Sequence, residues 1–359
     1  MVNGALGVIL AFPMWRRGFA KVTGSVIDEA IRRGHDVALM WDLDDKPGEA
    51  VRSPEIRAQW PAAKIVRSPY RPADVVIGDP SIGECSTAPV PTFALDFVWE
   101  HRMRPAVPGV TRCWSTAYQR DAFARHDFTV ARTCSGCDEP VTGMTALDAL
   151  PLVDADAVRA RYTLDRPYLL LFSLKFGVPR AWRRWLSVGR QYPWLLAALR
   201  AYCERRGWLL VVKTRVKHRD PGSMARVADR VIADDDLWPY TSAALVKGAA
   251  LVVHFQSGAV FEAAAAGVPQ LSIAVPQPHL AHLGGHGVFF ATTPGNLQHW
   301  PGVVQSAADM NEARAMVMED RVMTAVREDA LATYAERYTG PLDGRSAARV
   351  LDVVEARCP

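Results

Sequence analysis

The chain has 359 residues, of which 49% are hydrophobic, and its 42 Lys and Arg against 38 Asp and Glu give a formal net charge of +4. This length predicts two domains, and so small a net charge argues against a protein that coats nucleic acid. The sequence contains no apolar run of the roughly 18 residues that a membrane-spanning helix needs. Its first residues lack the basic segment and cleavage site of a secretory signal and read as a strand, so we expect a cytoplasmic protein.

The first 145 residues alternate between strand and helix patterns. Apolar runs predict strands at 6–12, 37–41, 75–77, 92–95 and 129–131, and spacing predicts helices at 22–33 and 115–125. Ser115 is the expected cap of the second helix. The first strand, helix and second strand form a β-α-β unit, whose strands should be parallel with a right-handed crossover. We interpret 42–72 as a long connection and 144–162 as a charged, helical linker.

A second set of elements follows the linker. We expect strands at 168–173, 208–213, 249–253 and 271–273, helices at 193–206, 242–247 and 259–266, and a mostly helical tail from Met310. Gly267 should end the helix before the last of these strands. The alternation predicts a second parallel sheet covered by helices on both faces. The sequence therefore predicts an α/β protein with two domains and a ligand cleft between them, at the carboxyl ends of the strands.

The most informative stretch is LVVHFQSGAVFEAAAAGVPQLSI at 251–273. A strand, a small polar turn of Gln256, Ser257 and Gly258, and a helix together predict an anion site, because backbone N–H groups and the Ser257 hydroxyl face the turn. Glu262 lies about one helical turn later. There its carboxylate can accept hydrogen bonds from a ribose while the turn holds phosphates. The alternative is an ordinary turn of a doubly wound protein, with Glu262 favouring the helix start.

A basic segment follows the strand at 208–213, on the expected same edge of the sheet. It runs KTRVKHRDP and contains Lys213, Arg215 and His218. Cationic side chains at such an edge suit a diphosphate, and His218 can donate a proton to a leaving oxygen. The alternative is a solvated loop whose charges serve solubility.

Candidate bases for an acceptor hydroxyl come after the strand at 92–95. They are Asp96, Glu100 and His101. The Arg-Arg-Gly loop at 16–18 ends the first strand of the same domain and can face an acceptor or a phosphate. Each of these residues taken alone is more often structural.

Cys134 and Cys137 form the one CxxC of a chain with six cysteines. A structural zinc needs four ligands, and no second CxxC or paired His follows at a fitting distance. We therefore expect reduced thiols and no metal.

The stretch 180–194, RAWRRWLSVGRQYPW, combines basic and aromatic side chains. That composition suits peripheral contact with a membrane surface or a lipid-linked acceptor. A charged helix or loop on the outside of the second domain is the commoner explanation.

Four segments in this order resemble the CDP-glycerol glycerophosphotransferase and surface-carbohydrate-biosynthesis group of GT-B fold glycosyltransferases. They are 114–123, 141–150, the stretch 251–273 with its preceding loop 213–221, and 338–350. The stretch 251–273 is also similar to the non-hydrolysing UDP-GlcNAc 2-epimerases. The family's Trp-His-Gly segment has its nearest counterpart in Trp99-Glu100-His101, where Glu follows Trp.

The resemblance implies a GT-B fold with two Rossmann-like domains, at 1–155 for the acceptor and 156–335 for the donor, and a last helix within 336–359 that returns to the first domain. It implies a metal-independent transferase, without a cofactor, that moves a glycosyl or glycerophosphate-type group from a UDP- or CDP-linked donor to an acceptor hydroxyl in cell-surface polysaccharide or glycoconjugate synthesis. The acceptor would be a small molecule, a glycan or a lipid-linked molecule. The alternatives are a sugar-nucleotide 2-epimerase and a non-catalytic scaffold that binds nucleotide sugars.

Overall fold

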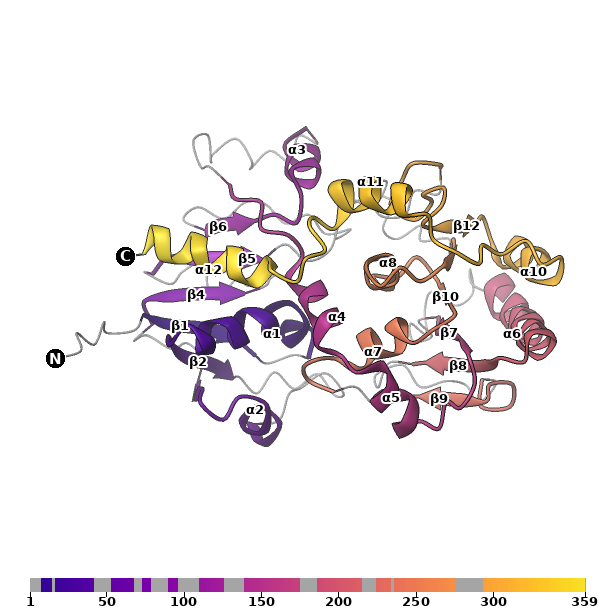
Figure 1. Ribbon diagram of the computed structural model, residues 1–359, viewed down its shortest axis with the longest axis horizontal. Helices are drawn as coiled ribbons and strands as arrows, with labels where there is room; N and C mark the ends of the chain where they lie inside the picture. Colours follow the sequence, from indigo (N-terminus) through magenta and orange to yellow (C-terminus); the bar gives the residue numbers. More distant parts are fainter. Residues whose placement is uncertain are drawn as a thin grey trace.

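The computed structural model describes residues 8–14, 17–41, 53–67, 73–78, 90–95, 110–125, 139–174, 186–214, 224–233, 236–275 and 293–358. Within these residues the strands form two six-stranded sheets, each covered by helices (Figure 1). Every strand pair in both sheets is parallel. The predicted α/β class is therefore confirmed.

The first sheet has the strand order β3-β2-β1-β4-β5-β6. Its strands are β1 (Ile9–Pro13), β2 (Asp36–Trp41), β3 (Lys64–Arg67), β4 (Val75–Gly78), β5 (Thr92–Leu95) and β6 (Val110–Cys113). The two strands that the sequence analysis missed, β3 and β6, are the edges of this sheet. β3 begins with the exposed Lys64 and β6 contains the buried Arg112, and these charged residues leave each strand without a continuous apolar run. The strand expected at 129–131 lies outside the described residues.

The second sheet has the order β12-β11-β10-β7-β8-β9. Its strands are β7 (Tyr168–Phe172), β8 (Leu209–Lys213), β9 (Arg230–Ile232), β10 (Leu251–His254), β11 (Gln270–Ile273) and β12 (Gln305–Ala307). Numbered within their own halves, both sheets run 3-2-1-4-5-6, the order of a doubly wound dinucleotide-binding fold. In such sheets ligands bind beyond the carboxyl ends of the strands, where the winding direction reverses. These switch points lie between β1 and β4 and between β7 and β10.

Helices cover both sheets, and several of them start at residues other than those predicted; the first helix begins at Arg17, five residues before its expected start. The helices are α1 (Arg17–Arg32), α2 (Ser53–Gln59), α3 (Ala117–Arg125), the 3₁₀ helix η3 (Thr145–Asp148), α4 (Ala149–Leu152), α5 (Ala155–Arg161), α6 (Leu186–Arg206), α7 (Thr241–Lys247), α8 (Ala259–Ala265), α10 (Met310–Met318), α11 (Glu328–Tyr338) and α12 (Ser346–Arg357). The start predicted at Pro193 is wrong, because α6 begins seven residues earlier and runs through this proline; its long buried face offsets the hydrogen bond that a proline removes. The cap of α3 is Thr116 rather than Ser115, since the Thr116 hydroxyl accepts from the Gln119 N–H at 2.9 Å.

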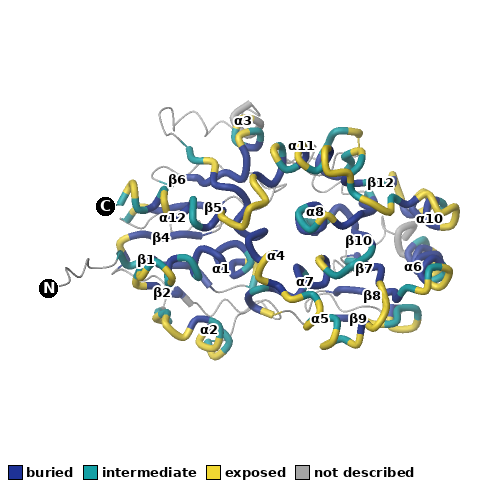
Figure 2. The backbone as a smooth tube through the Cα atoms, in the orientation of Figure 1, coloured by how far each residue is buried: buried dark blue, intermediate teal, exposed yellow. Residues whose placement is uncertain are grey.

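One hydrophobic core joins the two halves. The same cluster of buried side chains contains Phe19 and Val26 from α1 and Val260 and Phe261 from α8. Figure 2 shows buried backbone along both sheets and along α1 and α8, while α2, α5 and α10 carry exposed residues. In Figure 1 the arrows of β4 and β6 point toward the second half and those of β8 and β9 toward the first. Among the described helices, none is long and apolar enough to cross a membrane.

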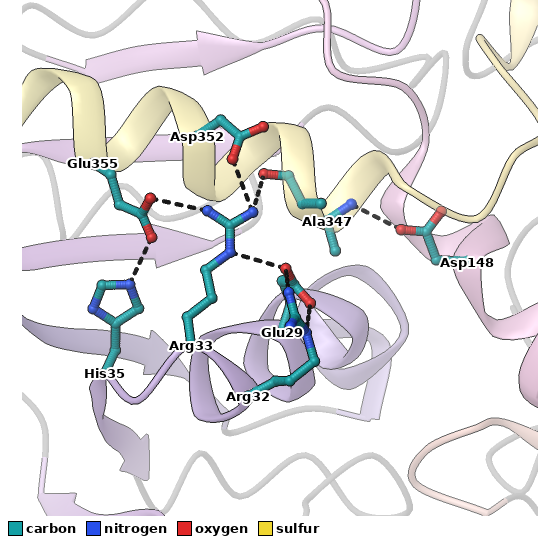
Figure 3. Close-up of polar contacts among 9 residues, drawn as sticks. Glu29, Arg32, Arg33, His35, Asp148, Ala347, Asp352 and Glu355 are labelled. Atoms are coloured by element: carbon teal, nitrogen blue, oxygen red, sulfur yellow. Dashed lines mark hydrogen bonds and ion pairs between the residues drawn. The ribbon is translucent and has the colours of Figure 1, made fainter.

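The C-terminal helix α12 lies against α1 of the first half (Figure 3). Arg33 reaches three carboxylates, with its guanidinium 2.9 Å from Glu355, 2.8 Å from Asp352 and 2.9 Å from Glu29. The start of α12 is held by Asp148, whose carboxylate accepts from the Ser346 and Ala347 N–H groups at 3.3 and 2.8 Å. Burial raises the pKa of this carboxyl. The chain thus returns to its first domain after building the second sheet.

Substitution of Arg33 by Met should lower the free energy of unfolding by about 2 kcal/mol, because hydrogen bonds to charged partners are among the stronger ones in proteins. Arg32→Met is the matched control, since the Arg32 side chain is 69% exposed and its ion pair reaches Glu29 alone, one turn away. It should change stability far less than Arg33→Met does, because exposed ion pairs contribute little. Urea unfolding of both variants measures the difference, and equal losses would contradict the importance of the α1–α12 contact.

Candidate functional site

The turn between β10 and α8 lies at the switch point of the second sheet. Ser257 and Gly258 are partly exposed. A Cβ built on Gly258 would meet no described atom within 4 Å, so the described part of the chain leaves space above this glycine. The Ser257 hydroxyl accepts from the Ala259 N–H at 3.0 Å, which places its own proton away from the helix. The predicted phosphate-binding residues therefore lie together at a partly open turn.

Gln256 lies behind this turn instead of facing the space above it. The side chain is buried and accepts from the Val275 N–H at 3.1 Å, which ties the turn to the end of β11. Its backbone has a φ of +44°, a left-handed conformation that is rare for a residue with a side chain. Gln256 thus helps to shape the turn, and its predicted contact with a ligand stays a prediction.

A buried histidine supports the turn from the core. His254 is fully buried at the end of β10, and its Nδ1 accepts from the Ser257 N–H at 3.3 Å. The ring therefore carries its proton on Nε2, 3.0 Å from the Gln270 side-chain oxygen, and the Gln270 amide donates to the Val260 carbonyl at 3.2 Å. Burial lowers the pKa of His254 to about 4, so the imidazole is neutral near pH 7. These hydrogen bonds were not predicted from the sequence, where their one sign is a histidine in an otherwise apolar strand.

Glu262 lies one turn into α8, where the sequence predicted it, but it is paired. Its side chain is 3% exposed and forms an ion pair with Lys21 of α1, whose side chain is 23% exposed. The Lys21 ammonium also lies 4.5 Å from the centroid of the Tyr240 ring. The candidate ribose-binding carboxylate therefore meets a cation from the other half of the molecule.

Lys21 belongs to a stripe on α1, together with Gly24 and Asp28, that faces the second half. The two oxygens of Asp28 accept from the indole N–H groups of Trp60 and Trp238, each at 2.7 Å. Burial raises the pKa of Asp28, and these two hydrogen bonds oppose the shift. The Trp238 ring packs directly on Gly24. Lys21, Gly24 and Asp28 lie three and four positions apart, on one face of α1. Their contacts fix the segment before α7, and with it α8, against α1.

Of the other predicted site residues, the structure describes Lys213 and leaves the rest undescribed. Lys213 is buried at the end of β8, two strands from β10 on the same edge of the sheet, and donates to the Thr214 carbonyl at 3.0 Å. The remaining candidates lie outside the described residues: Asp96, Glu100, His101, Arg215, His218, Cys134 and Cys137. Among the residues that the structure describes, no group of three His, Cys, Asp or Glu side chains is placed to hold a metal ion.

Proteins of known structure share this arrangement of two sheets. The chain has the GT-B fold. A putative UDP-N-acetylglucosamine 2-epimerase from Listeria monocytogenes is 12% identical, with a TM-score of 0.59 over 98% of this chain and 96% of that one. The UDP-GlcNAc 2-epimerase from Methanocaldococcus jannaschii, in complex with UDP-GlcNAc and UDP, is 11% identical, with a TM-score of 0.59 over 97% of this chain and 100% of that one.

The wall teichoic acid polymerase TagF is a third such protein. It is 10% identical, with a TM-score of 0.56 over 98% of this chain and 88% of that one. The sequence itself matches no protein-family model and no curated protein. At sequence identities of 10–12%, the likeness establishes the fold. It confirms the predicted resemblance to the 2-epimerases and to the glycerophosphotransferase group as a resemblance of fold.

The packing of Trp238 on Gly24 predicts opposite effects for two glycines of α1. Gly24→Ala should destabilise the protein by about 1–3 kcal/mol, because the new Cβ would come within 2.3 Å of the indole ring. Gly18→Ala should leave stability unchanged or raise it by up to about 1 kcal/mol, since no described atom lies within 4 Å of its Cβ position. Urea unfolding tests both, and a loss for Gly18→Ala as large as that for Gly24→Ala would contradict the packing argument.

The lowered pKa of His254 predicts a pH dependence of stability. The unfolded chain takes up a proton near the ordinary pKa of 6.5, whereas the folded chain does so at about 4. Stability should therefore fall as the pH drops from about 6.5 to about 4, by about 3 kcal/mol from this group. Unfolding free energies measured across this range should lose that slope in His254→Leu, which is less stable overall; parallel curves for the two proteins would contradict a neutral His254.

Proposed function

We propose that the protein binds a nucleotide-activated donor of the UDP or CDP class at the turn between β10 and α8. It transfers a glycosyl or glycerophosphate-type group from this donor to an acceptor hydroxyl, without a metal ion, in the synthesis of a surface polysaccharide or glycoconjugate. The observation that carries the proposal is the placement of Glu262, a buried carboxylate one helical turn beyond the partly open Ser257-Gly258 turn.

The position of the turn supports a nucleotide. It lies beyond the carboxyl end of β10, beside β7, where the strand order of the second sheet reverses. The Ser257 hydroxyl and the Gly258 N–H suit phosphate oxygens, and Glu262 suits the paired hydroxyls of a ribose. The buried chain from His254 through Gln270 holds the turn in shape before a ligand arrives, which lowers the cost of ordering it on binding.

The leaving group of this reaction is a nucleotide phosphate, whose negative charge must be stabilised. Hydrogen-bond donors aimed at developing charge supply that stabilisation without a metal. In the proposed site these are Ser257 and Gly258, with Lys213 at the same edge of the sheet. Arg215, two residues after Lys213 in the sequence, would add a second cation. Asp96, Glu100 or His101, which follow β5 of the first sheet, would take the proton of the acceptor hydroxyl, and His218 would protonate a leaving oxygen.

A 2-epimerase acting on a sugar nucleotide is the second candidate. The near-complete coverage by the Listeria and Methanocaldococcus epimerases favours it as much as the likeness to TagF favours a transferase. An epimerase converts its sugar nucleotide in the absence of any acceptor, whereas a transferase requires one. A non-catalytic scaffold would bind the nucleotide sugar without converting it under either condition. Incubation with UDP-GlcNAc, followed by chromatography of the sugar, separates these functions.

The proposed site predicts that one of UDP, CDP, GDP or CMP raises the melting temperature of the wild-type protein. A ligand at about 100 times its dissociation constant stabilises the folded state by roughly 2.7 kcal/mol. Glu262→Gln should weaken this binding at least tenfold, because a hydrogen bond to a carboxylate is about twice as strong as one to an amide.

The matched control is Glu319→Gln, which removes the same charge from an exposed residue paired with Arg321. It should bind the nucleotide as the wild type does. If no nucleotide shifts the melting temperature, or if both variants behave alike, the proposed site is wrong.

A further inference from the structure

The ion pair between Lys21 and Glu262 joins residues 241 positions apart, one on each side of the junction between the two halves. Glu262 is nearly inaccessible to water in this state. A buried carboxylate without a partner is strongly unfavourable, so the contact with Lys21 offsets the cost of burying Glu262. The contact is therefore a requirement of the ligand-free protein and not a chance meeting of surface side chains.

Lys21 itself is held by groups from both halves. Its ammonium lies over the Tyr240 ring, and the Tyr240 hydroxyl donates to the Ala146 carbonyl at 3.0 Å. One turn further along α1, Gly24 packs against Trp238. The lysine thus has a defined place beside Glu262 and is not a solvated chain that reaches it occasionally.

The same carboxylate is the group to which we assign the ribose. Two ribose hydroxyls donating to Glu262 would occupy both of its oxygens, one of which already accepts from Lys21. A nucleoside also has volume, and it must fit at a carboxylate that α1 now covers. The lysine and the ribose therefore compete for one acceptor.

Resting on the function proposed above, we propose that Lys21 occupies the ribose position at Glu262 in the ligand-free protein and that a nucleotide must displace it. Lys21 is then a residue that sets nucleotide affinity from the opposite half of the molecule. Nucleotide binding and the contact between α1 and α8 are coupled. Such coupling is reciprocal, so nucleotide binding weakens the contact by the same factor by which the contact weakens nucleotide binding.

The test measures dissociation constants of UDP, CDP and their uncharged nucleosides, uridine and cytidine, for wild type, Lys21→Met and Lys21→Arg. Lys21→Met should bind the preferred nucleotide and its nucleoside about tenfold more tightly, a typical size for such coupling. Lys21→Arg should bind both severalfold more weakly, because a guanidinium holds a carboxylate through two parallel hydrogen bonds. The nucleosides separate competition at the ribose from any attraction between Lys21 and a phosphate.

Lys64→Met is the matched control, since Lys64 is an exposed lysine 3.8 Å from Asp36 on the edge of the first sheet. Its affinities should equal those of the wild type, and circular dichroism establishes that each variant is folded. If Lys21→Met does not fold, Lys21→Arg decides alone, and tighter or unchanged binding in it overturns the inference.

Three other outcomes overturn the proposal. Nucleoside affinity that is unchanged in Lys21→Met means that lysine and ribose do not compete, and weaker binding of UDP or CDP alone means that Lys21 contacts phosphate instead. Both leave the proposed function intact if Glu262→Gln still loses affinity. Absence of binding in the wild type and in Lys21→Met overturns the proposed function itself, and this inference with it.

Discussion

The burial of charged groups along one face of α1 constrains the rest of this molecule. Glu262 needs Lys21, and Asp28 needs the indoles of Trp60 and Trp238, because a buried carboxylate without partners is strongly unfavourable. Both contacts cross the junction between the halves, because Lys21 pairs with Glu262 of the second half and Asp28 accepts from Trp238 of the second half as well as from Trp60 of the first. The two sheets are thus held in one relative position by the same groups that border the proposed nucleotide site.

The chain passes between the halves twice, and the two passages are bonded to each other. The Met144 N–H donates to the Thr339 carbonyl at 3.2 Å, and a Cβ on Gly340 would come within 2.5 Å of the Ser115 carbonyl oxygen. Asp148, at the end of the first passage, holds the start of α12 beyond the second. A change in the angle between the sheets must therefore act on both passages together. The α1–α8 contact lies across the same junction, so breaking the Lys21–Glu262 pair removes a restraint on that angle.

Local patterns were sufficient to predict the central strands but not the edges. β5 and β10 are short apolar runs buried on both faces, and such runs are visible in any sequence. Edge strands such as β9 and β12 are three residues long and have only one buried residue each, so their existence depends on the neighbour they pair with. Gly267 ended α8 as predicted, in a left-handed conformation that glycine adopts at no cost. The central strands and the end of α8 depend on residues that are close together in the sequence, so they can be predicted from it.

The partners of the site residues could not be predicted in this way. The turn at Ser257-Gly258 and Glu262 follow from spacing, but Lys21 is 241 residues from Glu262 and Trp238 is 210 from Asp28. Single contacts over such separations leave no periodic signal. Gly24 comes closest to such a signal, because a glycine inside an amphipathic helix commonly marks a close approach by another element.

The fold is shared by enzymes of different chemistry, so each half has to be considered separately when a function is inferred. An epimerase and a transferase can hold a nucleotide in the same way while differing in what approaches the sugar. In the doubly wound order seen here, the second sheet presents the turn, Glu262 and Lys213 on one edge, and these suit the part of the donor that both reactions share. In the proposed transfer, the base that takes the proton of the acceptor would come from the carboxyl ends of the first sheet, which face the second sheet (Figure 1). Lys21 lies in α1, directly after β1 of that first sheet, yet contacts the carboxylate of the second. Displacement of Lys21 by a nucleotide, as proposed, would release a contact of the half that supplies this base, and would thereby link occupation of the donor site to the arrangement of the acceptor side.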